Sequence, residues 1–379
     1  MSITYRFLEP LDVLFLRGNK LFGDPGSFGE SLIPPWPSVA AGAIRSRMLV
    51  DEAIDLVAFA KSEIVHPTLG TPAHPGSFTL AGFYLARRQH GTTEILMPLP
   101  ADLVISKDDA GHLRVSRLQP TAVALASSFG LPLLPVLAQG VSRGKPVSGY
   151  WLTQAGWQCY LQGDTPAAAH LVASSELWKL DARVGIGMSA ATRSVGNGKL
   201  FSAQAVALAN GVGFLAAVWG ATPPANGLLR LGGDGRAATI DAVDVTPPAP
   251  DYPTIAQATR CRLVLTSPGL FPAGWQLPGC HNDNRVTLPG GITGRLVCAA
   301  VPRAEVLSGW DLAKKKPKPA QRVAPTGSVY WLDELQATPE ALGKLVDNGL
   351  WGEPCEDAQR KAEGFNRISL ALWAEDKKD

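Results

Sequence analysis

The residues best suited to contact phosphate lie in a glycine-rich loop near the N-terminus. The loop RGNKLFGDPGSFGE carries Arg17, Gly18 and Lys20 after an apolar strand pattern and leads into PPWPSVAAGAIRSR. Ser38 is a favourable N-cap residue, so this second stretch predicts the start of a helix. The first N–H groups of a helix lack partners within it and favour a nearby negative charge. A phosphate there would meet these N–H groups and both cations; the alternative is a surface loop with an ordinary helix cap.

A second basic segment, RVGIGMSAATRSVGNGKLF, begins at Arg183 and also contains Arg193 and Lys199 among its glycines. Glycine lets a backbone approach RNA closely, and the cations can then meet phosphates. The composition favours an RNA-contacting loop here over a plain hairpin connection, although the hairpin stays open. A separate hairpin is expected between KLFSAQAVAL and VGFLAAVWG, because Asn210-Gly211 favours a tight turn.

Two more segments have a composition that suits anion binding. In LRLGGDGRAA, the N–H groups around Gly232 and Gly233 could form an anion-binding concavity beside Arg236, and a tight turn without a ligand is the alternative. The run KKKPKPAQR begins with the three lysines 314–316, and its prolines keep it extended, so it could follow a phosphate chain. A solvated charge run is the alternative there.

The sequence lacks the better-marked catalytic motifs. GVSRGKP has the wrong glycine spacing for a phosphate-binding P-loop, and neither H-E-x-x-H nor G-x-S-x-G occurs. His66 and His74 bracket a Pro/Gly loop and could act as acid or base in RNA cleavage, but no second proton-transfer partner is evident. We therefore expect no enzyme activity, no metal and no cofactor.

The elements that position these segments form two groups. Residues 3–16, 78–87 and 93–105 are expected to be strands and 39–53 a helix, with Ala40, Ile44 and Met48 on its buried side, which gives a βαββ start. Beyond the proline-rich boundary TPPAPDYPT, the order is βββαβ, with a helix capped by Thr338. The order predicts a pair of α+β sandwiches, in domains 1–245 and 255–379. Residues 110–182 are left open, as part of a sheet or as a projecting arm.

Composition restricts the kind of binding. The formal net charge is +2, whereas a nonspecific duplex binder is normally more basic, so any grip on RNA should be local. Hydrophobic residues make up 46% and charged residues 18%, and no apolar run near twenty residues or secretory signal is evident. We expect a soluble, cytoplasmic protein.

Five stretches, taken together, resemble a known family. PLDVLFLRGNKLFG, PPWPSVAAGAIR, RVGIGMSAATRSVGNGKLFSAQAVAL, LGGDGRAA and GWDLAKKKPKPAQRVAPTGSVYW are similar in order and spacing to the third subunit of the Cmr (type III-B) CRISPR effector complex, of the RAMP superfamily. The resemblance implies an α+β fold of two ferredoxin-like (RRM-like) domains with long Gly/Pro-rich insertions. It also implies binding of the 5′ handle of a CRISPR guide RNA, and docking against the large polymerase-like subunit and the backbone RAMP subunits.

The sequence thus predicts a non-catalytic subunit that holds the guide RNA by its 5′ handle for antiviral defence. A metal-independent RAMP endoribonuclease that processes guide precursors is the first alternative, and a protein interaction module without RNA contact is the second. The candidate RNA-binding residues are Arg17, Gly18, Lys20, Ser38, Arg45, Arg183, Arg193, Lys199, Gly232, Gly233, Arg236, Lys314, Lys315 and Lys316.

Overall fold

A computed structural model of the chain describes residues 2–16, 28–29, 31–125, 130–138, 145–189, 191–311, 314 and 316–374. Its contacts divide the chain into two compact units. Unit 1 comprises Met1–Thr93, Ser174–Asp244 and Leu307–Ala320, and unit 2 comprises Glu94–Ala173, Val245–Val306 and Gln321–Asp379. The domain ranges 1–245 and 255–379 stay a prediction. The units group residues 94–173 with the C-terminal part of the chain.

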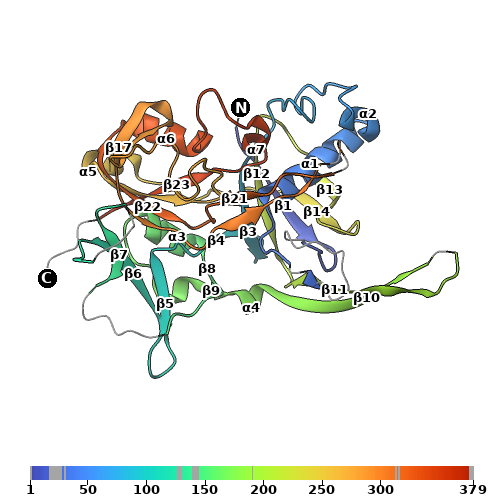
Figure 1. Ribbon diagram of the computed structural model, residues 1–379, viewed down its shortest axis with the longest axis horizontal. Helices are drawn as coiled ribbons and strands as arrows, with labels where there is room; N and C mark the ends of the chain where they lie inside the picture. The colour runs from blue at the N-terminus through green and yellow to red at the C-terminus, as the bar shows by residue number, and fades with distance from the viewer. Residues whose placement is uncertain are drawn as a thin grey trace. The chain divides into compact units, whose positions relative to one another are not determined.

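Unit 1 is built on an antiparallel set of strands in the order β13-β14-β1-β12-β3 (Figure 1). The strands are β1 (Thr4–Pro10), β3 (Thr79–Gln89), β12 (Val212–Trp219), β13 (Asn226–Arg230) and β14 (Ala237–Ala242). Helix α1 (Pro37–Asp51) packs against β3 and β13, and the short α2 (Leu56–Ala60) follows it. Of the strands in this sheet, β1 precedes α1 in the sequence and β3 follows it, and β12 lies between these two strands.

The predicted helix is present, but its start differs from the expectation. Ala40, Ile44 and Met48 are buried, as their spacing predicted. The helix begins at Pro37 with Trp36 in the N-cap position and no side-chain cap, so Ser38 lies in the first turn and does not cap the helix. Proline suits the first helical position because its φ is already helical and it lacks an N–H. This preference outweighed the capping preference of serine.

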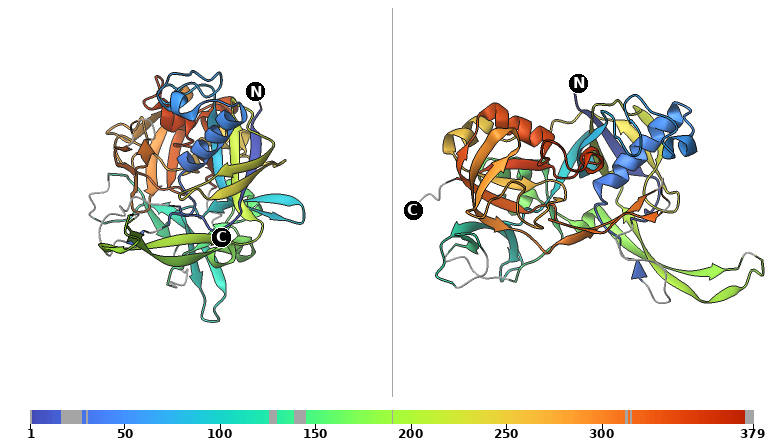
Figure 2. Two further views of the ribbon diagram at one scale, coloured as in Figure 1. Left: turned by 90° about the vertical axis from the view of Figure 1, so that its right-hand side faces the viewer. Right: turned by 45° about the horizontal axis from the view of Figure 1, so that its top comes forward.

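The segment expected to be a loop at 183–199 is a long β-hairpin, which we call the arm (residues 178–208). β10 (Trp178–Met188) pairs antiparallel with β11 (Val195–Leu208), and the two form the long green hairpin of Figure 2. The pairing begins at Trp178–Leu208, and its register shifts between Ile186 and Met188. Strand pairing satisfies backbone groups that a loop would leave to water. The interpretation as a loop was therefore wrong, and the hairpin alternative describes the backbone.

The hairpin expected across Asn210-Gly211 is not formed, although strands lie on both sides of that turn. β11 pairs with β10 and with the two-residue β2 (Phe28–Gly29), whereas β12 pairs with β1 and β3. Gly211 has a φ of +73° and accepts a hydrogen bond from the Arg88 N–H, so this turn connects two separate sheets. Long-range pairing prevailed over the local turn signal.

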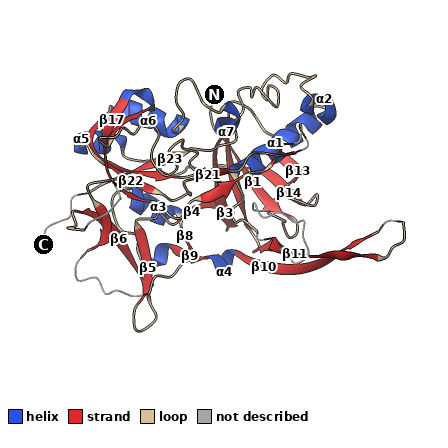
Figure 3. Cartoon of the chain, viewed as in Figure 1, coloured by secondary structure: helices blue, strands red, loops and turns tan. Residues whose placement is uncertain are grey.

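Unit 2 contains a 5-stranded antiparallel sheet in the order β16-β17-β22-β15-β23. Its strands β17, β22 and β23 are labelled in Figure 3. Its elements are α5 (Tyr252–Ala258), β15 (Cys261–Leu265), β16 (Arg285–Leu288), β17 (Ile292–Ala300), β22 (Val329–Gln336), α6 (Pro339–Asn348), α7 (Ala358–Ala362) and β23 (Ile368–Leu372). Thr338 accepts the Ala341 N–H and caps α6, as predicted. The structure combines mostly antiparallel sheets with a few helices, which confirms the α+β class. Within the described part of the chain, no helix is long and apolar enough to cross a membrane.

Residues 94–173 supply further strands of unit 2, in the orders β5-β6-β7 and β4-β8-β9. These are β4 (Thr92–Pro98), β5 (Leu103–Lys107), β6 (Leu113–Thr121), β7 (Leu134–Leu137), β8 (Tyr150–Leu152) and β9 (Leu171–Ala173), with α3 (Gln154–Leu161) between the last two. The stretch 149–163, within the residues 110–182 that the sequence left open between a sheet and an arm, is a short strand followed by a helix. Thr153 caps that helix by accepting the Gly156 N–H.

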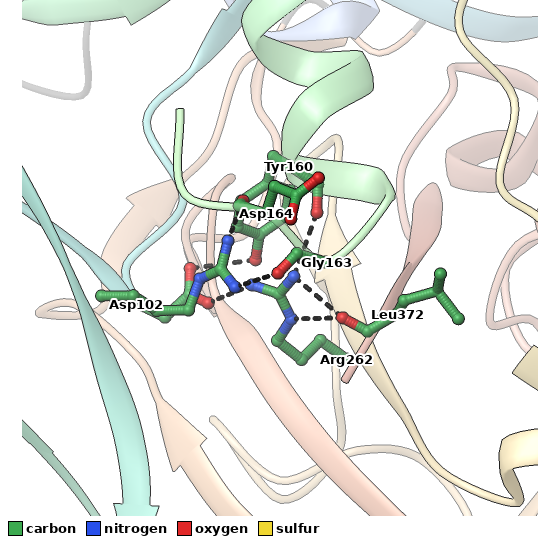
Figure 4. Close-up of polar contacts among 7 residues, drawn as sticks. Asp102, Tyr160, Gly163, Asp164, Arg262 and Leu372 are labelled. Carbon is green, nitrogen blue, oxygen red and sulfur yellow. Dashed lines mark hydrogen bonds and ion pairs between the residues drawn. The ribbon is translucent and has the colours of Figure 1, made fainter. Parts of the chain in front are cut away.

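A buried ion pair joins this stretch to the 5-stranded sheet of unit 2 (Figure 4). Arg262 on β15 donates to Asp102 Oδ2 at 2.7 Å, and their side chains are 1% and 0% exposed. The Tyr160 hydroxyl donates to the other Asp102 oxygen at 2.9 Å. Arg262 also donates to the carbonyls of Tyr160 and Leu372. Burial raises the pKa of Tyr160 well above its usual range, so the hydroxyl stays a donor.

A second arginine completes this cluster. Arg117 donates to the carbonyls of Gly163 and Asp164 and lies over the Tyr160 ring, 5.7 Å from its centroid. Burial, reinforced by the like-charged Arg262, lowers the pKa of Arg117 to about 10. Asp102 is thus the carboxylate that compensates two neighbouring guanidinium groups.

Removal of the Asp102 carboxylate would leave a buried guanidinium without its counter-charge. We expect Asp102→Ala to lower the free energy of unfolding by about 3–5 kcal/mol, measured by urea unfolding followed by tryptophan fluorescence. Asp108→Ala is the control, because the Asp108 side chain is exposed and its bonds to His112 should contribute much less to stability. Similar losses in the two variants would contradict this role for the buried pair.

Candidate functional site

The two ends of the N-terminal glycine-rich loop are fixed against the arm of unit 1. Leu14 and Val206 exchange two backbone hydrogen bonds of 2.8 Å, and the Leu32 N–H donates to the Leu16 carbonyl. Beyond the loop, β2 pairs parallel with β11, and the Ser31 hydroxyl donates to the Gln204 carbonyl. Arg17, Gly18 and Lys20 themselves lie outside the described residues. The flanking contacts nevertheless place both ends of their loop beside β11.

Phe15 is the point where several predicted residues meet. The guanidinium carbons of Arg236 and Arg183 lie 5.2 Å and 5.9 Å from the centroid of its ring. Gly233 donates its N–H to the Phe15 carbonyl at 2.8 Å. Gly232, with a φ of +78°, packs against the same carbonyl. The structure therefore brings together three segments that are far apart in the sequence: the start of the loop, the arm and the 231–236 turn.

The turn at 231–236 is closed by its own backbone. The Leu231 N–H donates to the Arg236 carbonyl at 2.9 Å, and Gly233 is already engaged by Phe15. These hydrogen bonds form a tight turn, which was the alternative to an anion-binding concavity. Binding of an anion by the other N–H groups of the turn stays a prediction.

Each guanidinium beside Phe15 already has a carboxylate partner. Arg183 pairs with Asp181 at 2.8 Å, and Arg236 pairs with Asp12 at 2.7 Å. The two ion pairs leave no excess positive charge among these four side chains. A phosphate would have to share these cations with the aspartates, so additional cations are needed for a strong grip.

The far end of the arm supplies one such cation. Arg193 lies at its tip with a φ of +50° and is held there by a 2.8 Å hydrogen bond from its N–H to the Ser189 carbonyl. Its side chain is exposed, and within the described residues no ion pair engages it. Lys199 lies on β11, but its side chain is outside the described residues.

The two faces of β10 differ in polarity, a feature that the sequence reasoning missed. Lys179, Asp181 and Arg183 alternate with apolar residues, and strand geometry places the two sets on opposite faces. The apolar set includes large exposed side chains: Leu180 51%, Val184 71%, Ile186 48% and Met188 56%. The alternation of polar and apolar residues in WKLDARVGIGM could have predicted this strand, but the glycines in the same stretch suggested a loop.

The predicted residues of α1 have packing roles. The Arg45 guanidinium carbon lies 4.7 Å from the centroid of the Phe78 ring. Ser38 is half-buried in the first turn, and the Val39 N–H already donates to the Trp36 carbonyl at 2.9 Å. Part of the hydrogen-bonding capacity expected at this helix start is therefore used within the chain.

The lysine-rich run forms a small strand pair in unit 1. β19 (Trp310–Asp311) pairs antiparallel with β20 (Lys316–Pro317). Lys314 lies 3.7 Å from Asp311, while Lys316 is exposed on β20, and Lys315 is outside the described residues. The backbone is extended at β20, as the prolines predicted.

His66, the candidate acid or base, is fully engaged in unit 1. Its ring is 3% exposed, and Nδ1 accepts the N–H groups of Thr68 and Leu69, both at 3.1 Å. The ring proton therefore resides on Nε2, which lies 3.1 Å from Glu52 Oε2. His66 therefore stabilises the turn at residues 66–69 through these hydrogen bonds. His74 is exposed, and its backbone N–H is bound by the Thr71 hydroxyl.

The close approach at Gly232 can be tested against Gly235 in the same turn. Both glycines have a positive φ, but a Cβ at Gly232 would lie 2.9 Å from the Phe15 carbonyl oxygen, whereas a Cβ at Gly235 meets nothing within 4 Å. We expect Gly235→Ala to cost about 1–2 kcal/mol of unfolding free energy, the strain of a left-handed residue, and Gly232→Ala to cost more. Thermal unfolding of the two variants measures the difference. Equal losses would show that Phe15 does not confine the turn.

Comparison with known proteins identifies the family. The family described as CRISPR-associated protein (Cas_Cmr3) matches residues 6–373. No curated protein matches the chain.

Two solved structures are similar to this chain. One is described as a cryo-EM structure of the Type III-B Cmr-beta bound to cognate target RNA; it is 14% identical, covers 96% of both chains and has a TM-score of 0.49. The other, the same complex with target RNA and AMPPnP in state 1, is 16% identical, covers 97% of this chain and 99% of that chain, and has a TM-score of 0.48. The family match confirms the resemblance seen in the sequence. Because that match extends over nearly the whole length, the chain belongs to the Cas_Cmr3 family of CRISPR-associated proteins.

Proposed function

We propose that this chain is a non-catalytic, cytoplasmic subunit that holds the 5′ handle of the guide RNA in a type III-B effector complex. The observation that carries the proposal is the convergence on Phe15 of the start of the glycine-rich loop, the arm and the 231–236 turn. These are three of the segments in which the sequence predicts phosphate contact. The proposed partners are the guide RNA, the large polymerase-like subunit and the backbone RAMP subunits.

We also propose that each unit contains a ferredoxin-like domain. In unit 1 the order β14-β1-β12-β3 separates the two strands that flank α1 by one antiparallel strand. In unit 2 the order β17-β22-β15-β23 does the same for the strands that flank α6. This split arrangement supports the ferredoxin-like plan in both units. Among the described residues, α1 corresponds to the first of the two helices in that plan and α6 to the second. The Gly/Pro-rich segments are the proposed insertions.

The charge distribution supports a local and shared grip on RNA. Phosphate contacts fix the position of a nucleic acid without reading its sequence, and a few cations suffice where neighbouring subunits hold the same strand. Arg193 and Lys316 are exposed cations, whereas Arg183 and Arg236 are partly neutralised by aspartates. A subunit of this kind needs no strongly basic surface, in keeping with a net charge of +2.

Charge reversal on the arm tests the proposal. We expect the double variant Arg183→Glu/Arg193→Glu to raise the Kd for a labelled handle RNA at least about tenfold, because two charged contacts to phosphate are lost. The plot of log Kd against log salt should also become shallower. Arg285→Glu is the matched control, since Arg285 is exposed and lies on β16 in unit 2. Unchanged RNA affinity and unchanged guide retention in the assembled complex would refute the role of the arm.

The competing endoribonuclease function predicts that the purified chain cleaves precursor guide RNA, whereas the non-catalytic proposal predicts no cleavage. We expect the purified chain to leave precursor guide RNA intact, because both ring nitrogens of His66 are occupied. Denaturing gel electrophoresis of labelled precursor after incubation measures this directly. If the wild-type chain cleaves the precursor and the His74→Ala variant does not, the enzymatic function replaces the non-catalytic proposal.

A further inference from the structure

The end of α1 and the whole of α2 expose an unusual amount of apolar surface. We call residues 50–65 of unit 1 the α2 corner. Val50, Leu56, Val57 and Val65 are 53%, 44%, 62% and 73% exposed. α2 has the sequence LVAFA and contains no buried residue. Isolated apolar side chains are common on protein surfaces, whereas several within one short structural unit mark a contact surface.

The α2 corner is held in one conformation by its own hydrogen bonds. Asp55 caps α2 by accepting the Val57 N–H at 2.8 Å. The Ile54 N–H donates to the Leu49 carbonyl, and the Glu63 N–H donates to the Ala58 carbonyl. His66 Nε2 then joins the following turn to Glu52 at the end of α1. A surface ordered in this way can bind a partner without an additional ordering cost.

Acidic side chains accompany the apolar ones and restrict what can bind. Within residues 50–65 there are four carboxylates, Asp51, Glu52, Asp55 and Glu63, and one cation, Lys61. Arg47 pairs with Asp51 at 2.6 Å and Lys61 lies 3.8 Å from Glu63, so the acidic excess is two charges. Glu52 and Glu63 are 53% and 59% exposed. Such a rim repels RNA phosphates and anionic lipid headgroups, and it repels a second copy of the same corner. It attracts an apolar surface that carries lysine or arginine at its edge.

We propose that the α2 corner is a docking surface for another protein subunit of the effector complex, one whose contact face is apolar with a basic rim. The inference rests on the proposed function only for the membership of that subunit in the complex. It assigns the α2 corner to protein contact, distinct from the arm and the Phe15 region that are proposed to contact RNA. Val57 and Leu56 are the expected apolar anchors, and Glu63 is an expected rim charge.

Substitution of the anchors tests the surface in the reconstituted complex. The full chain is assembled with the separately purified, individually identified subunits and guide RNA. We expect Val57→Asp and Glu63→Lys each to reduce incorporation of this chain at least tenfold and Val123→Asp, at a comparably exposed valine of unit 2, to leave it unchanged. Aspartate is favourable in the first turn of a helix and Glu63 is exposed, so both variants should fold.

A photo-crosslinker placed at Val57 identifies the occupant. A crosslink to one of the purified subunits supports the proposal, whereas a crosslink to guide RNA, to a second copy of this chain or to nothing in the intact complex overturns it. Incorporation unaffected by both Val57→Asp and Glu63→Lys would also overturn it. Affinity of the isolated variants for handle RNA should equal that of the wild type. This measurement separates failure of the docking surface from failure of the proposed RNA binding.

Discussion

The candidate interface depends on the backbone pairing of β11. One edge of this strand pairs with β10 along the arm, and the other edge receives Phe28 and Gly29 of β2 and Leu14. Backbone hydrogen bonds need no particular side chains, so the surface residues of the arm can vary while the anchoring persists. The arm and both ends of the glycine-rich loop are thus fixed relative to one another by one strand. Phe15 and the 231–236 turn add contacts to this frame.

Charge separates two kinds of surface within unit 1. Near Phe15 each arginine is balanced by an aspartate, which lowers the cost of holding two guanidinium groups close together. At the α2 corner carboxylates exceed cations, so this surface is unsuited to the ligand that the arm is proposed to hold. The side-chain charge is therefore balanced near Phe15 and negative at the α2 corner. This distribution is consistent with a chain that contacts both RNA and protein.

The sequence predicted elements with regular periodicity and failed where long-range pairing decided the outcome. The buried side of α1 and the Thr338 cap of α6 follow from local rules, and both were correct. The partners of β11 were not predictable from Asn210-Gly211, because a turn signal does not specify which strands pair across it. The glycines of β10 suggested a loop, yet the side-chain alternation of a strand was present. The convergence at Phe15 joins residues more than two hundred positions apart, which spacing alone cannot reveal.

The pairing of Asp102 with Arg262 also lay beyond local rules, since these residues are 160 positions apart. This ion pair favours one packing of residues 94–173 within unit 2. An ionised carboxylate without a partner in this interior would cost several kcal/mol, so packings of residues 94–173 that miss Arg262 are penalised. Apolar contacts alone tolerate shifts in register, whereas the hydrogen bonds from Tyr160 and Arg262 to the two Asp102 oxygens require a defined geometry. Residues 94–173, which are distant from β15 in the sequence, are thereby attached to that strand in one arrangement.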